Sequence, residues 1–75
     1  MLLKFTTHFQ IRMQERGINV DHVKKAIKEP DSSETVFENR KEVHKKMDGK
    51  EIVVVYFKDG FRDKQEYIVI TAYYI

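Results

Sequence analysis

The chain contains no cysteine among its 75 residues, and it has only one proline and three glycines. Without cysteine there are no disulfide bonds and no thiolate metal ligands, which fits the reducing environment of the cytoplasm. No apolar run approaches the roughly 20 residues of a membrane-spanning helix. The first residues also lack the apolar core of a signal peptide. We therefore expect a cytoplasmic protein that does not enter a membrane.

Length and charge set further limits. Seventy-five residues form one domain, 1–75, and a chain this short buries only about 60–65% of its unfolded surface, so self-association would help to stabilise it. Charged residues make up 35% of the chain, yet the net charge is only +2. Lys and Arg predominate in residues 1–30 and 40–50, and Asp and Glu predominate in residues 31–39. These blocks favour a local anion-binding patch over general nucleic-acid coating, although blocks this short also arise in ordinary surface charge.

The N-terminal part of the chain predicts a short helix from His8 to Arg16. Thr7 and Gln10 have the spacing of a capping box, which places the start of the helix at His8. Gly17 has the position of a C-terminal cap, because glycine adopts the left-handed conformation that commonly ends a helix.

A second helix is predicted to begin after Asn19, its N-terminal cap, and to end near Glu29, before Pro30. Its apolar residues recur at the spacing of one buried helical face: Val20, Val23, Ala26 and Ile27. Two helices joined by so few residues pack against each other as an αα-hairpin.

After Pro30, apolar residues tend to recur at every second position, as in a strand, and no longer at the spacing of a helix. Strands are predicted over residues 33–38, 40–47, 51–58 and 66–74, with a short opening strand over residues 2–6. Asp48-Gly49 is a two-residue hairpin signal, and Asp59 opens a longer charged turn that runs through Lys64. The predicted fold class is therefore α+β, with a helical hairpin packed on one face of a four-stranded antiparallel sheet and a short N-terminal strand in addition.

The Asp48-Gly49 turn decides which residues share each face of the sheet. Its register gives three facing pairs: Met47–Lys50, Lys45–Ile52 and Val43–Val54. This face is the more apolar one, and we assign it to the helices. The opposite face combines polar residues of one strand with apolar residues of the next: Arg40, Glu42, His44, Lys46, Val53, Val55 and Phe57. Apolar side chains that no helix covers predict a homo-oligomer or a protein partner on this open face.

The first helix carries a row of three polar side chains. His8, Arg12 and Arg16 are spaced four residues apart, so they lie one above another on one helical face. Two guanidiniums and an imidazole that titrates near neutral pH are suited to bind a phosphate. The alternative is a solvated face in which Arg12 pairs with Glu15 or Glu38. Arg16 would then interact only with the carbonyls at the end of the helix.

Three segments of the sequence together resemble a known group of proteins. The motif His-x3-Arg-Met-x2-Arg-Gly-Ile over residues 8–18 is followed by a capped helix that ends at Pro30-Asp31, and the apolar strand 68–73 comes near the end of the chain. The order of a short strand, two helices and an antiparallel sheet resembles the RelE/ParE superfamily of small bacterial toxins. The motif is more similar to a family of small uncharacterised domains that is grouped with those toxins and with the BrnT type.

The resemblance implies a RelE-like fold and a toxin-type module. The best-known members of the superfamily cleave RNA without a metal or other cofactor and are neutralised by an antitoxin, whereas ParE-like members act on DNA gyrase and cleave no RNA. Many RelE-like enzymes place catalytic Arg or Tyr side chains on the last strand. Here residues 66–75 contain no Arg, Lys or His, which departs from that pattern, and Tyr73 or Tyr74 would fill part of the role.

Metal-independent RNA cleavage needs a base, an acid and cations that hold the charge of the phosphorane. His8 is one acid–base candidate, because the positive end of a helix dipole favours its neutral form. His44 is the second acid–base candidate, and Tyr73 is a candidate hydrogen-bond donor. The candidate phosphate-binding residues lie on the first helix and on the strand over residues 40–47: Arg12, Arg16, Arg40 and Lys46.

Each candidate also has a plainer interpretation. His8 suits a helix-start residue, His44 a cross-strand residue and Tyr73 a core or interface residue. Three histidines without cysteine give no metal ligand set. A helix-turn-helix DNA reader is disfavoured, because the second helix has no Asn, Gln or Arg row at its N-terminal end. The alternative function is a non-catalytic module that binds a protein partner through the open face.

Overall fold

The computed structural model describes residues 2–59 and 66–75. In chain order its elements are β1 Leu2–Phe5, α1 Thr7–Arg16, α2 Val20–Lys28, β2 Ser32–Val36, a 3-10 turn Phe37–Asn39, β3 Arg40–Met47, β4 Lys50–Asp59 and β5 Glu66–Tyr74. The predicted α+β class is confirmed. The charged turn expected after Asp59 lies outside the described residues.

The strands form one mixed, five-stranded sheet in the order β1-β5-β4-β3-β2. From β2 to β5 the neighbours are antiparallel, as predicted, but β1 pairs in parallel with β5. The four predicted antiparallel strands are therefore present, and the predicted N-terminal strand joins the same sheet as a fifth, parallel strand. The fifth strand is held by its own apolar residues, because Leu3 and Phe5 face Tyr67 and Val69 and pack against the core.

The hairpin between β3 and β4 has the predicted register. Met47 faces Lys50, and Val43 faces Val54. The two turn residues, Asp48-Gly49, both have positive φ, 51° and 75°, as a type I′ turn requires. The faces of the sheet therefore carry the residues assigned to them from the sequence.

α1 begins one residue earlier than predicted from the sequence. The side chain of Thr6, not of Thr7, caps the helix by accepting a hydrogen bond from the N–H of Phe9 at 3.1 Å. The predicted capping box is wrong, because the Gln10 side chain donates to a backbone carbonyl of β1 instead. At the other end, Gly17 has the predicted left-handed conformation, with φ of 62°.

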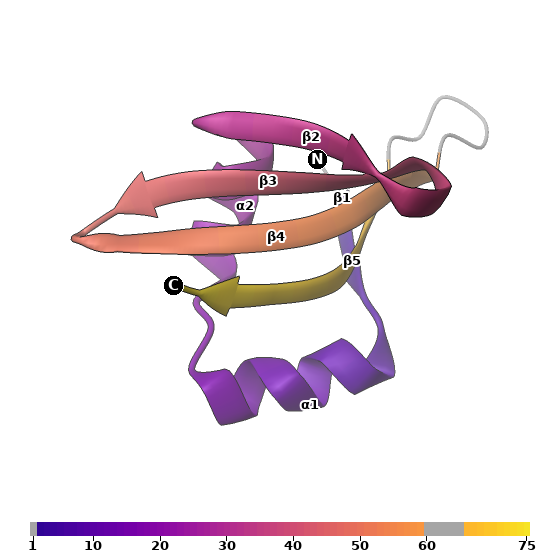
Figure 1. Cartoon of the computed structure of the whole chain (residues 1–75). Coiled ribbons are helices and arrows are strands. Elements are labelled where there is room, and N and C mark those ends of the chain that lie inside the picture. The colour runs from indigo at the N-terminus through magenta and orange to yellow at the C-terminus, as the bar shows by residue number, and fades with distance from the viewer. Residues whose placement is uncertain (1, 60–65) are drawn as a thin grey trace.

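The two helices take different places around the sheet and do not pack closely against each other, so the predicted αα-hairpin is wrong: each helix places its apolar side chains on the sheet instead. α2 lies behind β3 and β4, and α1 lies along β5 (Figure 1). Asn19 caps α2 as predicted, by accepting a hydrogen bond from the N–H of Asp21 at 2.8 Å. Helices and sheet share one core, whose fully buried members include Phe9, Val23, Val43, Ile52, Val54 and Val69.

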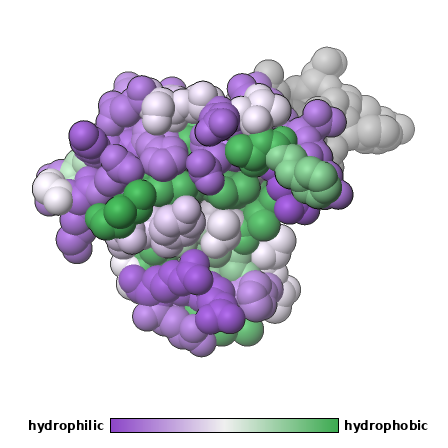
Figure 2. Space-filling view, in the orientation of Figure 1, coloured by the Kyte–Doolittle hydropathy of each residue, from purple (hydrophilic) through white to green (hydrophobic). Residues whose placement is uncertain are grey.

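The opposite, open face of the sheet exposes less apolar surface than expected. Val53, Val55 and Phe57 do lie there, but Val53 is 0% exposed and the other two are half-buried. Val53 is enclosed because His44 and Tyr73 face it from the two neighbouring strands. Figure 2 shows the result as a hydrophobic band across the middle of this face, bordered by hydrophilic side chains above and below.

Candidate functional site

The three members of the α1 row have different surroundings. The side chain of His8 is exposed and makes no hydrogen bond or ion pair within the described part of the chain. Arg12 Nη1 lies 3.5 Å from Glu15 Oε2, in the solvent-exposed pairing considered as the plainer alternative. Among the described contacts, Arg16 alone of the three is fixed by residues outside its own helix.

Arg16 binds the free edge of β5. Its Nη1 donates to the carbonyl of Ala72 at 3.1 Å and to Oγ1 of Thr71 at 3.3 Å. β1 pairs only with the first part of β5, so no strand of the described residues lies on the outer side of Ala72. Thr71 faces Val55, a residue of the open face. The guanidinium therefore stands at the rim of the open face, and its Nε and Nη2 have no partner among the described residues.

A row of side chains crosses the open face from that rim. Tyr73 of β5 faces Val53 of β4, which faces His44 of β3. Strands lie about 4.8 Å apart, so the backbones of Tyr73 and His44 are roughly 10 Å apart. Tyr73 is 39% exposed. The fold thus places two candidate residues, 29 positions apart in the sequence, on one face beside Arg16.

His44 is held between two carboxylates. Its Nδ1 lies 3.0 Å from Glu51 Oε2, and its Nε2 lies 3.3 Å from Glu42 Oε2. The hydrogen bond with Glu51, followed by that with Glu42, raises the pKa of His44 above its ordinary value, against a smaller opposing effect of desolvation. Only the imidazolium can donate to both carboxylates at once. His44 is therefore arranged to carry a proton.

Lys46 adds a cation beside this cluster. It faces Glu51 in the β3–β4 ladder, and its ammonium has no ion-pair partner in the described part of the chain. Its backbone N–H donates to Asp31 at 2.7 Å, which lowers the pKa of that carboxyl group. Lys46 is thereby anchored through its backbone while its ammonium stays available.

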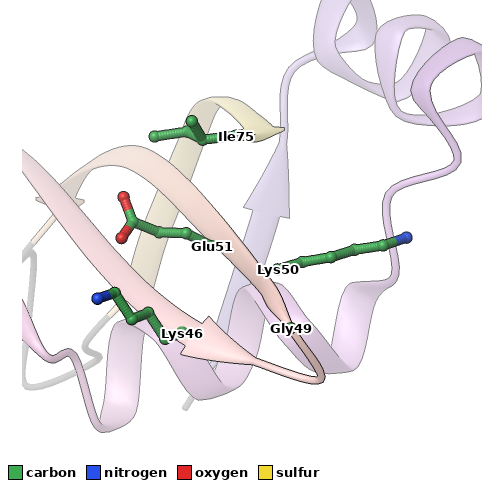
Figure 3. A pocket seen from close by; sticks show the side chains of 5 residues that line it. All are labelled: Lys46, Gly49, Lys50, Glu51 and Ile75. Carbon is green, nitrogen blue, oxygen red and sulfur yellow. The ribbon is translucent and has the colours of Figure 1, made fainter.

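Two hollows flank the His44 cluster. One, of about 330 Å³, is lined by Lys46, Gly49, Lys50, Glu51 and Ile75. Figure 3 shows Lys46 and Glu51 pointing to the same side of the hairpin, whereas Lys50 points to the other. The second, of about 270 Å³, is lined by Ser32, Ser33, Glu34, Glu42 and His44. The hydrogen-bonded chain Glu51–His44–Glu42 connects the two hollows.

Arg40 does not join this cluster. It lies on the open face of β3, but four residues from His44, which is roughly 13 Å along a strand. Its Nη2 lies 3.5 Å from Glu38 Oε2 instead. Within residues 2–59 and 66–75, no group of three His, Asp or Glu side chains is placed to hold a metal ion. In that same part of the chain no helix has the length and apolar character to cross a membrane.

The two partners of His44, Glu42 and Glu51, were not predicted from the sequence. The signal for Glu51 was present, because the hairpin register that pairs it with Lys46 also puts it on the face of His44. The contact of Arg16 with β5 had no such signal, because it depends on how α1 lies against the sheet.

Comparison with known proteins places this chain in a family. The family model described as a domain of unknown function (DUF4258) matches residues 5–74. The chain belongs to the DUF4258 family. No curated protein and no solved structure matches it. The matched residues run from the end of β1 to the end of β5, so α1, the His44 cluster and Tyr73 all lie within them.

Proposed function

We propose that this DUF4258 domain is a toxin-type module, related to the RelE/ParE superfamily, that cleaves RNA in the cytoplasm without a metal. The observation that carries the proposal is the convergence on one face of a doubly hydrogen-bonded His44, the phenol of Tyr73 and the half-free guanidinium of Arg16. These are an acid–base group, a hydrogen-bond donor and a phosphate ligand, which are the parts that cleavage by the ribose 2′-OH requires.

Each group has a defined role. Arg16 holds the phosphate with Nε and Nη2, because Nη1 is occupied by β5. Tyr73, next to that contact on β5, donates a hydrogen bond to the phosphorane. His44 in its charged form protonates the departing 5′-oxygen, and Glu51 or Glu42 takes the proton of the 2′-OH.

The charge of the open face determines where phosphate binds. Glu42 and Glu51 would repel a phosphate over the centre of the face, and protonated His44 offsets only part of that charge. Arg16 and Lys46, on either side of the cluster, are cations without a carboxylate partner in the described part of the chain. We therefore assign phosphate binding to Arg16 and Lys46. His8 and Arg12 continue the row along α1, where further phosphates of the same RNA would lie.

The test is cleavage of purified RNA in the presence of EDTA. We expect products that end in a 2′,3′-cyclic phosphate, and no cleavage of an oligonucleotide whose riboses are replaced by 2′-deoxyribose. Arg16→Lys keeps the positive charge but removes the two free guanidinium nitrogens that bind the phosphate, so it should lower the cleavage rate. Lys28→Ala on α2 should leave the cleavage rate unchanged. Products with 5′-phosphate ends, or equal cleavage of the deoxy oligonucleotide, would contradict the mechanism.

A second candidate function is protein binding through the open face, as a non-catalytic module or as a homo-oligomer. It is favoured by the hydrophobic band that Figure 2 shows on the open face, the face on which Val55 and Phe57 lie half-buried. Val55→Glu should shift an oligomer toward the monomer in sedimentation at tens of micromolar. A wild-type protein that sediments as a monomer under those conditions would exclude self-association through this face. Absence of RNA cleavage with and without ribosomes would favour this candidate.

A further inference from the structure

The outer edge of β2 is unpaired. β2 is the last strand of the sheet, and no described strand lies on its outer side. The side chains of its first four residues, 32–35, are all exposed. A strand edge of this kind carries a row of N–H and C=O groups that can pair with another strand.

The outward backbone groups belong to Ser33 and Thr35. Met47 and Lys50 flank a two-residue turn and therefore form a hydrogen-bonded pair, so the odd-numbered residues of β3 bond to β4. The even-numbered residues of β3 bond to β2, where they face Ser32, Glu34 and Val36. The N–H and C=O groups of Ser33 and Thr35 then point away from the sheet, two residues apart, as pairing with an added strand requires.

The negative charge of this edge favours an added strand that carries positive charge. Glu34 faces Glu42 on the same side of the sheet, and no cation of the described residues pairs with Glu34. Two carboxylates directly opposite each other repel. A strand added outside β2 would place one side chain directly beside Glu34, over the hollow that Glu34, Glu42 and His44 line. A Lys or Arg at that position would relieve the repulsion.

We propose that the edge of β2 binds an extended peptide segment carrying Lys or Arg, which joins the sheet as an added strand. A second copy of this chain paired through its own β2 is the wrong occupant. Two β2 strands paired around a two-fold axis would place Glu34 against Glu34, because residue 34 is the middle of the strand. An RNA strand is also disfavoured, because its phosphates would meet the same carboxylates.

The probe is an acetylated, amidated heptapeptide of alternating Thr and Lys, and the control probe replaces Lys with Glu. Binding is followed by two-dimensional ¹⁵N–¹H NMR and amide exchange on the full chain. We expect saturable binding of the Lys peptide only, with the amides of Ser33 and Thr35 protected from exchange. Glu34→Lys should weaken binding about tenfold or more, since it replaces an attraction by a repulsion.

The decisive variant is Thr35→Pro, which removes an outward N–H and leaves the bonds to β3 in place. It should abolish binding, and Thr35→Val, which keeps the N–H, should not. If Thr35→Pro does not fold, Glu34→Lys and the Glu peptide still decide the matter. Equal binding of both peptides, shifts centred on α2, or no binding at millimolar peptide would overturn the proposal. None of these readouts depends on RNA cleavage.

Discussion

Nδ1 of His44 lies 3.0 Å from Oε2 of Glu51, across the ladder between β3 and β4. This contact joins two residues of one hairpin, and it is the first cause of the raised pKa of His44. A group whose pKa is higher in the folded than in the unfolded chain binds its proton more tightly when folded. The stability of the domain is therefore linked to the charge of one imidazole.

The first prediction concerns pH and stability. The contribution of His44 is complete below the ordinary imidazole pKa of about 6.5, and it is lost as pH rises through the raised pKa of the folded chain. The free energy of unfolding, measured with urea, should fall over that pH range. Glu51→Gln should bring the pKa of His44, followed by NMR, down toward its ordinary value and flatten the fall. Glu34→Gln, which has no contact with His44, should leave the His44 pKa unchanged, and an unchanged pKa in Glu51→Gln would refute the assignment.

The second prediction separates the two arginines of α1. Arg16→Ala should cost about 1 kcal/mol of stability, because it leaves the Ala72 carbonyl without its charged donor. Arg12→Ala should change stability by less than about 0.5 kcal/mol, because its pair with Glu15 is solvent-exposed. Equal losses in urea unfolding would show that Arg16 does not hold the edge of β5.

The third prediction tests where α1 begins. Thr6→Ala should cost about 1 kcal/mol, because the hydroxyl that accepts the N–H of Phe9 is lost. Thr7→Ala should be nearly neutral, because Thr7 lies in the first turn and makes no capping bond. A larger loss of stability for Thr7→Ala than for Thr6→Ala in thermal unfolding would contradict this N-cap and support the one predicted from the sequence.

The fold was predictable where the sequence signal is local. Gly17, Asn19 and the Asp48-Gly49 turn each act within a few residues, and each ends, starts or reverses an element as predicted. The parallel pairing of β1 with β5 joins segments more than 60 residues apart, and no local pattern encodes it. Its apolar residues signalled only that a strand was there.

The candidate site likewise contains parts that the sequence predicts and parts that depend on long-range contacts. The hairpin register predicted that His44 and Lys46 share a face. The same register would also have predicted that Glu51 lies close to His44. The spacing of His8, Arg12 and Arg16 correctly placed them in a row on α1, but it did not reveal that their contacts differ. Arg16 is anchored to Ala72 while the side chain of His8 has no partner among the described residues, a difference that depends on how α1 lies along β5 and that the spacing of the row does not encode.

The initial rate of RNA cleavage in EDTA by His44→Ala, relative to wild type, tests the proposed function most directly. Loss of the proton donor should lower the rate by about 100-fold or more, while Lys28→Ala stays close to wild type and circular dichroism shows both variants folded. A His44→Ala protein that is folded and cleaves RNA at the wild-type rate would contradict catalysis at the open face.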